Sequence, residues 1–323
     1  MSRVIVIGAT GHVGTYLVPA LVEAGHEVVA ISRGMSDPYT PHAAWGHAER
    51  LTMDRDARER AGTFGQDIRS LKPDIVIDMI CFTKPSAEML VDALKGHVGH
   101  FLHTGTIWTH GTPVAVPTPE DAPKHPFGDY GIQKADIETY LLKTAHCEGF
   151  PATVLHPGHI VGPGWNPLNP QGNFNPEVFS ILARGEQLPL ANFGLETVHH
   201  VHAEDVARLF LAALSSRASA IGESFHAVSE KALTLRGYAE RMSRWFGRDP
   251  VLTFLPYDQW AADRPAEDAK ATWEHIARSP NCSMEKAKRL LGFVPRYTSL
   301  QAVEEAVTWL IEQGKVAPPS RAG

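Results

Sequence analysis

The fold of this chain is decided near its start by the stretch Val4-Ile5-Val6-Ile7-Gly8-Ala9-Thr10-Gly11-His12-Val13-Gly14. The run of β-branched residues predicts a buried strand, and residues 13–24 predict a helix after it. Glycines at such a turn let the backbone approach a pyrophosphate, whose charge is met by free amides and by the positive end of the helix. The spacing is Gly-x-x-Gly-x-x-Gly, and the alternative is an ordinary strand-to-helix turn. The stretch predicts a dinucleotide-binding loop whose cofactor-binding residues are Gly8, Thr10, Gly11, His12, Val13 and Gly14.

Apolar runs and amphipathic segments continue to alternate over the first half of the chain. Buried strands are expected at residues 4–7, 27–31, 74–77, 100–102 and 152–155, with helices at 13–24, 85–94 and 130–147. Such alternation implies right-handed crossovers and a parallel sheet that is covered on both faces. We therefore predict an α/β fold with a doubly wound parallel sheet, a Rossmann domain, over residues 1–165.

The composition and periodicity of the sequence change after residue 156. Residues 157–176 are rich in Pro and Gly with little periodicity, as in a binding loop or a crossing between domains. Helical patterns resume at residues 203–215, 235–246, 283–291 and 300–313. We expect residues 196–228 to return to the sheet domain and residues 166–195 and 229–315 to form a smaller C-terminal substrate lobe. Residues 316–323 are expected to be a flexible tail.

The composition narrows the class of partner. The 323 residues are 43% hydrophobic and carry a formal net charge of −6, whereas nucleic-acid binders usually show a basic patch. A small-molecule partner is therefore expected, and no nucleic acid. No stretch approaches the roughly 20 apolar residues that span a bilayer, and the first apolar run is too short for a signal peptide. Because Cys81, Cys147 and Cys282 are widely separated, we expect reduced thiols in a cytoplasmic protein without a membrane partner.

The end of the second expected strand bears on the choice of cofactor. NAD-binding proteins of this kind usually place an acidic residue there, on the ribose hydroxyls, but this chain has Ser32 and Arg33. A guanidinium can pair with a 2′-phosphate in bidentate fashion, so NADP is favoured over NAD. The alternative is that Arg33 is a solvated surface residue, and either cofactor remains open.

Tyr130 and Lys134 lie four residues apart in an expected helix, so their side chains share one face. A phenol titrates near ~10 in water, too high for efficient proton transfer at neutral pH, and a neighbouring ammonium lowers that pKa. Thr106 follows the expected strand 100–102, at the carboxyl edge of the sheet where ligands of such folds bind. The sequence therefore predicts Tyr130 as a general acid/base, with Lys134 and Thr106 beside it.

Together these motifs resemble the extended short-chain dehydrogenases/reductases of the NAD-dependent epimerase/dehydratase kind. Further motifs that follow in family order are Gly111, His156-Pro157-Gly158, Gly162-Pro163-Gly164, His202-Ala203-Glu204-Asp205-Val206-Ala207 and Leu291-Gly292-Phe293-Val294-Pro295. The resemblance implies that Tyr130 is the catalytic acid/base, that Lys134 lowers its pKa and anchors the ribose, and that Thr106 orients the substrate. A homodimer is also implied.

The resemblance extends to the cofactor site. It implies that Pro157 and Ile160 lie near the nicotinamide, that Ile80 lies along the cofactor and that Asp54 lies near the adenine. The expected reaction is hydride transfer between NADP(H), or NAD(H), and a sugar, a sugar nucleotide or a similar hydroxy or keto compound. A reductase and an epimerase would share this machinery.

Two departures from the family narrow the chemistry. The sugar-nucleotide dehydratases carry an Asp-Glu pair after the catalytic threonine, where this chain has Ile107-Trp108, so dehydration by that route is not expected. Many sugar-nucleotide enzymes hold the substrate pyrophosphate with an arginine at the place of Val198. A substrate without a diphosphate is therefore possible. Arg278 or Arg296 could instead replace the missing arginine and hold a pyrophosphate. Residues expected to line the substrate site are Trp108, His159, Trp165 and Asn173.

The sequence also leaves a metal site and a non-catalytic function to be considered. His199, His200 and His202, together with His156 and His159, suggest a metal site. Strand alternation sends His199 to the opposite face from His200 and His202, so no metal is expected. The segments Ser32-Arg33-Gly34 and Asp54-Arg55 look most like the branch that includes chloroplast stem-loop-binding proteins. That branch supplies the alternative function, a non-catalytic RNA-binding or cofactor-sensing protein. The net charge argues against the first, and the intact Tyr/Lys pair argues against the second.

Overall fold

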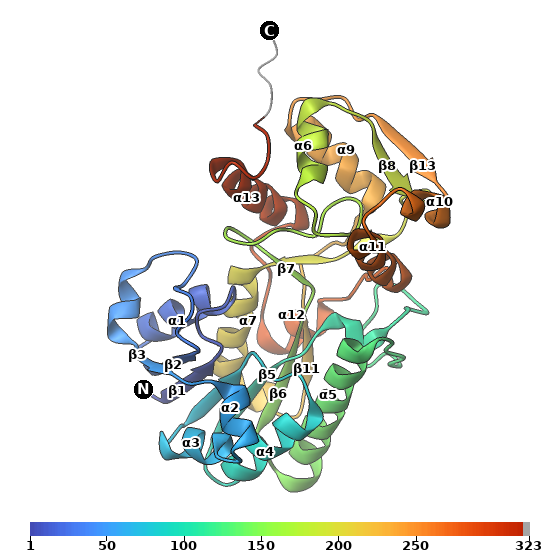
Figure 1. The fold of residues 1–323 in the computed structure, drawn as a ribbon. Helices are drawn as coiled ribbons and strands as arrows, with labels where there is room; N and C mark the ends of the chain where they lie inside the picture. The colour runs from blue at the N-terminus through green and yellow to red at the C-terminus, as the bar shows by residue number, and fades with distance from the viewer. Residues whose placement is uncertain (319–323) are drawn as a thin grey trace.

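The parallel sheet expected from the alternating pattern is the centre of the computed structural model, which describes residues 1–318 (Figure 1). The sheet has seven strands in the order β11-β6-β5-β4-β1-β2-β3, and all neighbouring pairs are parallel. The doubly wound α/β fold is thereby confirmed. The strands are β1 Arg3–Ile7, β2 Glu27–Ser32, β3 Glu49–Thr52, β4 Ile75–Asp78, β5 His100–Thr104, β6 Ala152–Pro157 and β11 Ser224–Ala227.

Helices cover both faces of this sheet because both faces of its central strands are apolar. One face is packed by α1, α7, α8 and α12, and the other by α3, α4 and α5. Helices and 3₁₀ turns of the sheet domain are α1 Gly14–Glu23, η1 Ala43–His47, α2 Arg55–Arg60, α3 Phe64–Ser70, α4 Lys84–Leu94, η2 Ile107–His110, α5 Asp129–Glu148, α7 Ala203–Ser215, α8 Arg217–Ala220 and α12 Glu285–Leu291.

A second lobe stands over the carboxyl ends of the strands (Figure 1). It has its own apolar core, built around α6, β8, α9 and α13. Its elements are α6 Glu177–Arg184, β8 Leu188–Ala191, β9 Thr197–Val198, β12 Leu233–Thr234, α9 Leu235–Trp245, β13 Leu252–Leu255, α10 Tyr257–Ala262, α11 Ala266–Arg278 and α13 Ser299–Glu312. The parallel pair β7 His159–Val161 and β10 His200–His202 connects it to the sheet domain.

The order of the strands positions the functional site. β1 lies between β2 and β4, so the connections leaving β1 and β4 run to opposite sides and open a crevice at their carboxyl ends. Doubly wound sheets bind their ligands in such a crevice. The glycine loop leaves β1 at this point, and residues 79–82 leave β4 beside it.

The structure differs from the sequence-based expectation at several elements. α12, expected in the substrate lobe, packs on the sheet domain through Ala287 and Leu291. Val316, expected in a flexible tail, is buried in the core of the second lobe, while residues 319–323 of that tail lie outside the described part of the chain. β3 was not expected because it is a short edge strand with little apolar character. Among residues 1–318, the helices are all too short or too polar to cross a membrane.

Candidate active site

A cleft of about 510 Å³ lies where the carboxyl ends of the central strands face the second lobe. The glycine loop and the segments that follow β4, β5 and β6 form one wall, together with Tyr130 and Lys134 of α5. Phe174 and residues 271–275 of α11 come from the second lobe. The expected catalytic residues Thr106, Tyr130 and Lys134 therefore share one cavity with the expected dinucleotide loop.

The glycine loop requires its glycines. Gly8 has φ +90°, and a Cβ on it would lie 2.7 Å from Cγ2 of Ile80. A Cβ on Gly14 would lie 2.0 Å from the carbonyl oxygen of Ala9. Both positions thus exclude a side chain, one by backbone conformation and contact and the other by contact alone.

The loop offers unpaired donors at the start of α1. Within residues 1–318, the backbone amides of His12 and Val13 have no hydrogen-bond acceptor. A second cavity of about 320 Å³ shares Gly8, Gly11 and Ile80 with the main cleft and extends to the ends of β2 and β3. Free amides at a helix N-terminus, close backbone approach and two adjoining cavities are what a dinucleotide needs, so the residues present fit such a cofactor.

The second cavity contains the remaining residues expected on the adenosine side. Thr10, Arg33 and Asp54 all line it. The Arg33 side chain is exposed and has no ion-pair partner within residues 1–318. The Asp54 side chain accepts a hydrogen bond from the amide of Ala57 at 3.0 Å and thereby caps α2. At the nicotinamide side, Pro157 and Ile160 line the main cleft.

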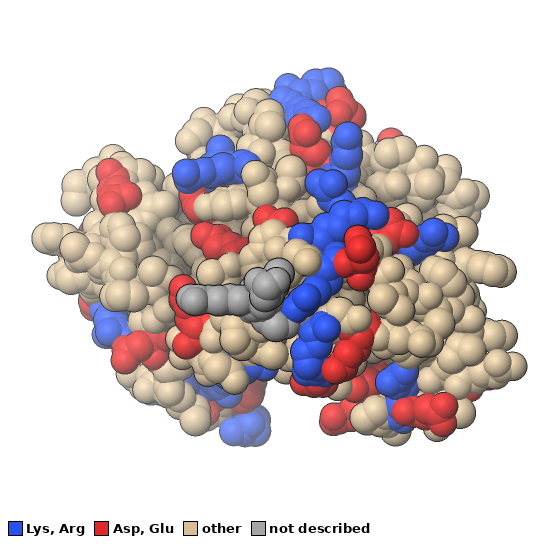
Figure 2. Space-filling model, turned by 90° about the horizontal axis from the view of Figure 1, so that it is seen from above, with Lys and Arg blue, Asp and Glu red and all other residues tan. Residues whose placement is uncertain are grey.

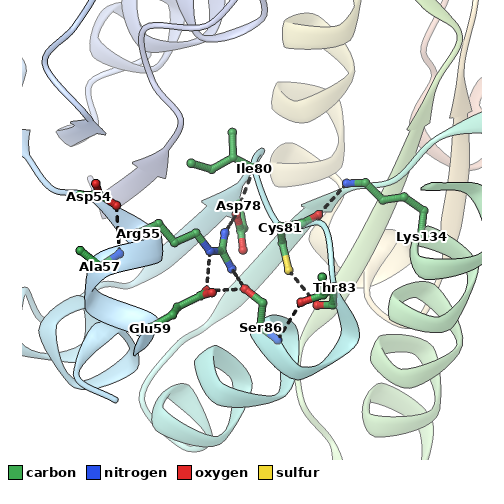
Figure 3. Close-up of polar contacts among 10 residues, drawn as sticks. All are labelled: Asp54, Arg55, Ala57, Glu59, Asp78, Ile80, Cys81, Thr83, Ser86 and Lys134. Atoms are coloured by element: carbon green, nitrogen blue, oxygen red, sulfur yellow. Dashed lines mark hydrogen bonds and ion pairs between the residues drawn. The ribbon is translucent and has the colours of Figure 1, made fainter. Parts of the chain in front are cut away.

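A buried ion pair, which the sequence analysis did not identify, holds the segment after β4 (Figure 3). Nη1 of Arg55 donates to Oδ1 of Asp78 at 2.7 Å, and the same oxygen accepts from the amide of Ile80 at 3.2 Å. The guanidinium also binds Ser86 and Glu59. The network therefore fixes Ile80 against Gly8. An acidic residue at the end of an otherwise apolar strand was the available signal.

Lys134 is fully buried and held by two backbone carbonyls. Its Nζ donates to the carbonyl oxygen of Cys81 at 2.7 Å (Figure 3). It also donates to the carbonyl oxygen of Thr104 at 2.7 Å. These carbonyls follow β4 and end β5, so the lysine connects α5 to the sheet edge. Burial lowers the pKa of Lys134 to about 8. One of its three donor directions remains for a ligand.

Tyr130 and Thr106 lie together in the cleft, with Tyr130 44% exposed and Thr106 7% exposed. Desolvation raises the pKa of Tyr130, and the hydrogen bond from Thr106 opposes this effect. The net shift is upward, opposite to the expected lowering by Lys134. The reason is that Lys134 Nζ is bound to its two carbonyls and stands 5.9 Å from the centre of the Tyr130 ring.

Three of the four residues expected to contact substrate line the cleft, and one does not. Trp108, His159 and Trp165 are lining residues. The prediction for Asn173 was wrong, because its side chain is 1% exposed and does not line the cleft. Its Nδ2 donates to Oγ1 of Thr272 at 3.2 Å, and its Oδ1 accepts from Asn169 at 2.6 Å, both within the second lobe. Its polar groups are needed where the loop joins α11.

Other lining residues were missed. Phe82 and Phe174 are 52% and 43% exposed and present their rings to the cleft, and Glu274 and His275 reach it from α11. α11 is separated along the chain from all catalytic motifs, so only the tertiary fold brings it here. Its amphipathic pattern could have identified the helix but not its place.

The residues considered for a diphosphate clamp lie elsewhere. Val198 is buried in the core of the second lobe. Arg278 is 2% exposed, lies 3.7 Å from the Trp108 ring centre and 3.9 Å from that of Phe127, and donates to the carbonyl of Phe127. Arg296 is an exposed residue that pairs with Glu204, outside the cleft.

The histidines of the β9–β10 segment each have a separate partner. His199 interacts with the carbonyl of Ser229, His200 with that of Leu168, and His202 lies 2.8 Å from Glu305. Ligand atoms of a different trio, Asp78, Cys81 and His103, lie within 4.8 Å of one another in the buried core. There the charge of Asp78 is already compensated by the guanidinium at 2.7 Å.

The surface charge bears on the nucleic-acid alternative. Figure 2 shows the face that carries the second lobe, where basic side chains are interspersed with acidic ones. On α6, Arg184 pairs with Glu177 and Glu186, and on α9 Arg236 pairs with Glu240. This face therefore presents mixed charge to a polyanion.

Known proteins with related sequences and structures include reductases and epimerases. A 2′-dehydrokanamycin reductase of Streptomyces kanamyceticus is 29% identical over 315 residues, covering 97% of this chain and 86% of that protein. A UDP-glucose 4-epimerase of Corynebacterium glutamicum is 25% identical over 330 residues, covering 94% of each. The structure of a UDP-glucose 4-epimerase from Thermotoga maritima matches with a TM-score of 0.72 at 22% identity, covering 96% of this chain and 99% of that one.

The branch that the sequence analysis singled out matches at lower identity. The chloroplast stem-loop binding protein of 41 kDa b from Arabidopsis thaliana is 23% identical over 323 residues, covering 94% of this chain and 78% of that protein. The family model described as the NAD dependent epimerase/dehydratase family matches residues 4–227, which include the glycine loop, Thr106, Tyr130 and Lys134. The chain therefore belongs to the NAD-dependent epimerase/dehydratase family.

Proposed function

We propose that this protein is an NAD(P)-dependent oxidoreductase, a reductase or an epimerase, which acts on a hydroxyl or ketone group of a carbohydrate-like small molecule. The observation that carries the proposal is the convergence of Thr106, Tyr130 and Lys134 in the cleft that also contains the glycine loop. When bound, the nicotinamide would supply or accept the hydride. The site residues supply the proton and the orientation.

The proposed roles follow from the environment of each side chain. Tyr130 presents a partly exposed hydroxyl to the cleft and exchanges a proton with the substrate oxygen. Thr106 Oγ1 is fixed by the amide of Trp108 at 3.3 Å and orients the same oxygen. Lys134 keeps one donor free, for a ribose hydroxyl of the cofactor.

The cofactor roles rest on the two cavities. The amides of His12 and Val13 would bind the pyrophosphate, Pro157 and Ile160 would border the nicotinamide, and the Arg33 and Asp54 region would hold the adenosine. The unpaired, exposed guanidinium of Arg33 supports NADP rather than NAD. The names of the relatives, a 2′-dehydrokanamycin reductase and UDP-glucose 4-epimerases, support a sugar-like substrate and leave two reactions with one machinery.

The replacement Tyr130→Phe tests the proposal. With NADPH and a panel of keto sugars, we expect kcat to fall by about 10²- to 10⁴-fold, because the proton donor is lost. Tyr140→Phe, on the same helix but outside the cleft, should retain full activity. Unchanged turnover in Tyr130→Phe would refute the mechanism.

Release or retention of the cofactor after one turnover then distinguishes a reductase from an epimerase. The homodimer implied by the family resemblance is tested by sedimentation.

A further inference from the structure

The first inference concerns the charge of the substrate and rests on the proposed function. Among the described residues that line the cleft, only Lys134 and Glu274 carry a fixed charge at neutral pH. Burial lowers the pKa of His12 and of His275 to about 4 and that of His159 well below its usual value, so these imidazoles are neutral. A diphosphate has no unused fixed cation here, since Lys134 is bound to two carbonyls at the catalytic corner.

Glu274 places a negative charge on the substrate side of the cleft. It is half-buried on α11, and within residues 1–318 its carboxylate has no hydrogen bond and no ion pair within 4 Å, while the Arg278 guanidinium acts on it only at longer range. The adjacent Arg278 offers its Nη1 to the backbone carbonyl of Glu274, with its side chain enclosed by the Trp108 and Phe127 rings. A phosphate in this part of the cleft would meet the carboxylate, and like charges at close range repel each other.

The remaining lining is aromatic and neutral. The rings of Phe82, Trp165 and Phe174 are each at least 43% exposed. Nε2 of His159 is buried and has no hydrogen-bond partner in the described chain. Exposed rings suit the apolar face of a sugar, and neutral imidazoles suit hydroxyl groups.

From this charge distribution we propose that the substrate is a phosphate-free polyhydroxy compound that packs a ring face on the aromatic wall, and that Glu274 keeps nucleotide diphosphates out. The carboxylate would also accept hydrogen bonds from substrate hydroxyl or ammonium groups. The same reaction chemistry at Tyr130 thus serves a substrate different from a sugar nucleotide.

Binding to the NADP⁺-saturated protein tests this inference, because saturation prevents UDP from occupying the cofactor site. For UDP-glucose we expect a Kd weaker than about 1 mM in calorimetry. Glu274→Gln should tighten UDP-glucose binding by about tenfold or more, because a repulsive charge is removed. Glu267→Gln, at an exposed position on the same helix, should change nothing. In parallel, kanamycin and glucose are tested as phosphate-free ligands, whose affinity Glu274→Gln should not improve.

The outcomes separate this inference from the proposed function. A micromolar Kd for UDP-glucose, or its turnover by the unmodified protein, would overturn the substrate class even if Tyr130→Phe abolishes that turnover. Equal UDP-glucose affinity in Glu274→Gln and the unmodified protein would overturn the role of Glu274. The proposed function would fail instead if Tyr130→Phe changed no reaction.

A second inference rests on a different observation, the buried contact between Glu138 and His156. Glu138 follows Tyr130 and Lys134 on the same face of α5, and its Oε1 lies 3.0 Å from Nε2 of His156. Nδ1 of His156 accepts the amide of Thr106 at 3.0 Å, and its Nε2 faces the carboxylate at ion-pair distance without a hydrogen bond within residues 1–318. Both side chains are about 1% exposed.

The backbone at Gly105 packs directly against the His156 ring. A Cβ on Gly105 would lie 2.4 Å from Nδ1 of His156, so the ring touches the backbone that carries Thr106. Burial opposes ionisation of Glu138, but His156 and Lys124 hold the pKa of its carboxyl well below the usual range. An ionised carboxylate therefore fixes the ring, and the ring fixes Thr106.

We infer that Glu138 and His156 are positioning residues that set the distance between the Thr106 and Tyr130 hydroxyls. They link α5 to the end of β5 in parallel with the bond from Lys134 to the Thr104 carbonyl. A displacement of the order of 1 Å at such a site can cost about 100-fold in rate.

Two substitutions at one position test the role. His156→Gln retains an acceptor for Thr106 and a donor for Glu138, so kcat should stay within about threefold, whereas His156→Leu should lower kcat by up to about 100-fold at unchanged KM for NADPH. His100→Leu, at a buried histidine at the other end of β5, controls for lost stability. If His156→Leu does not fold, Glu138→Gln provides the measurement of kcat. Equal kcat in Gln and Leu variants, or full activity of Glu138→Gln, would overturn the inference.

Discussion

The two walls of the cleft are built from different chemistry. The sheet-domain wall uses backbone groups and cations: the amides of His12 and Val13, the bound ammonium of Lys134 and, in the adjoining cavity, Arg33. The wall from the second lobe uses Phe174, neutral His275 and the carboxylate of Glu274. The first suits an anionic dinucleotide and the second a neutral polyhydroxy compound. In the proposed function, the charges of the two walls would keep the cofactor and the substrate in separate parts of the cleft.

The largest expected effect comes from the cation of the first wall. Lys134→Met should lower kcat/KM for carbonyl reduction by about 100-fold or more, because the donor left for the cofactor ribose is lost and α5 loses its bonds to two carbonyls, which displaces Tyr130. Lys143→Met, at an exposed position on the same helix, is the matched control. Steady-state kinetics with NADPH measure the effect. A loss smaller than tenfold would remove Lys134 from the mechanism.

The pH dependence sharpens the role of the same group. Since burial lowers the pKa of Lys134 from 10.5 to about 8, its ammonium is charged below that pH and loses its charge above it. We expect kcat/KM to fall above pH 8, by about tenfold per pH unit. The contribution to stability has the opposite sign: the folded protein binds fewer protons than the unfolded chain between pH 8 and 10.5, so this group adds stability as pH rises. A flat rate profile to pH 10 would contradict the assignment.

The adjoining cavity gives a smaller and more selective effect. Arg33→Ala should weaken NADPH binding by about 10- to 100-fold, because charge-assisted hydrogen bonds to the 2′-phosphate are lost, and should leave NADH binding within about twofold. Arg60→Ala, at an exposed residue of α2, serves as control. Fluorescence titration of both cofactors measures the difference. Equal losses for NADH and NADPH would mean that Arg33 does not select the phosphate.

The smallest effect on function is expected where the sequence analysis misplaced a residue. Asn173→Ala should lower the free energy of unfolding by about 1–3 kcal/mol, since buried partners such as Asn169 and Thr272 lose a hydrogen bond. The KM for substrate should change less than twofold, because Asn173 is not a lining residue of the cleft. Thermal unfolding and steady-state kinetics measure both. A changed KM with unchanged stability would restore Asn173 to the substrate site.

The sheet-domain wall was predictable from the sequence, and the wall from the second lobe was not. The alternation of strands and helices, the glycine loop and the pair Tyr130 and Lys134 are local patterns, with spacings set by a strand, a turn and one helical turn, so sequence reasoning found the fold and one wall of the cleft. The buried ion pair of Arg55 could not be predicted in this way, because its partner Asp78 lies on another element.

The sequence by itself determined the doubly wound sheet, the glycine loop at its edge and the placement of Tyr130 and Lys134 on one helix, since all three depend on residues close together in the chain. Only the tertiary structure brought α11 with Glu274 opposite those residues, enclosed Arg278 between rings and buried Asn173. These outcomes depend on packing between distant segments, and no local spacing encodes them. The proposed reaction therefore rests on short-range sequence patterns, and the proposed substrate class rests on long-range packing.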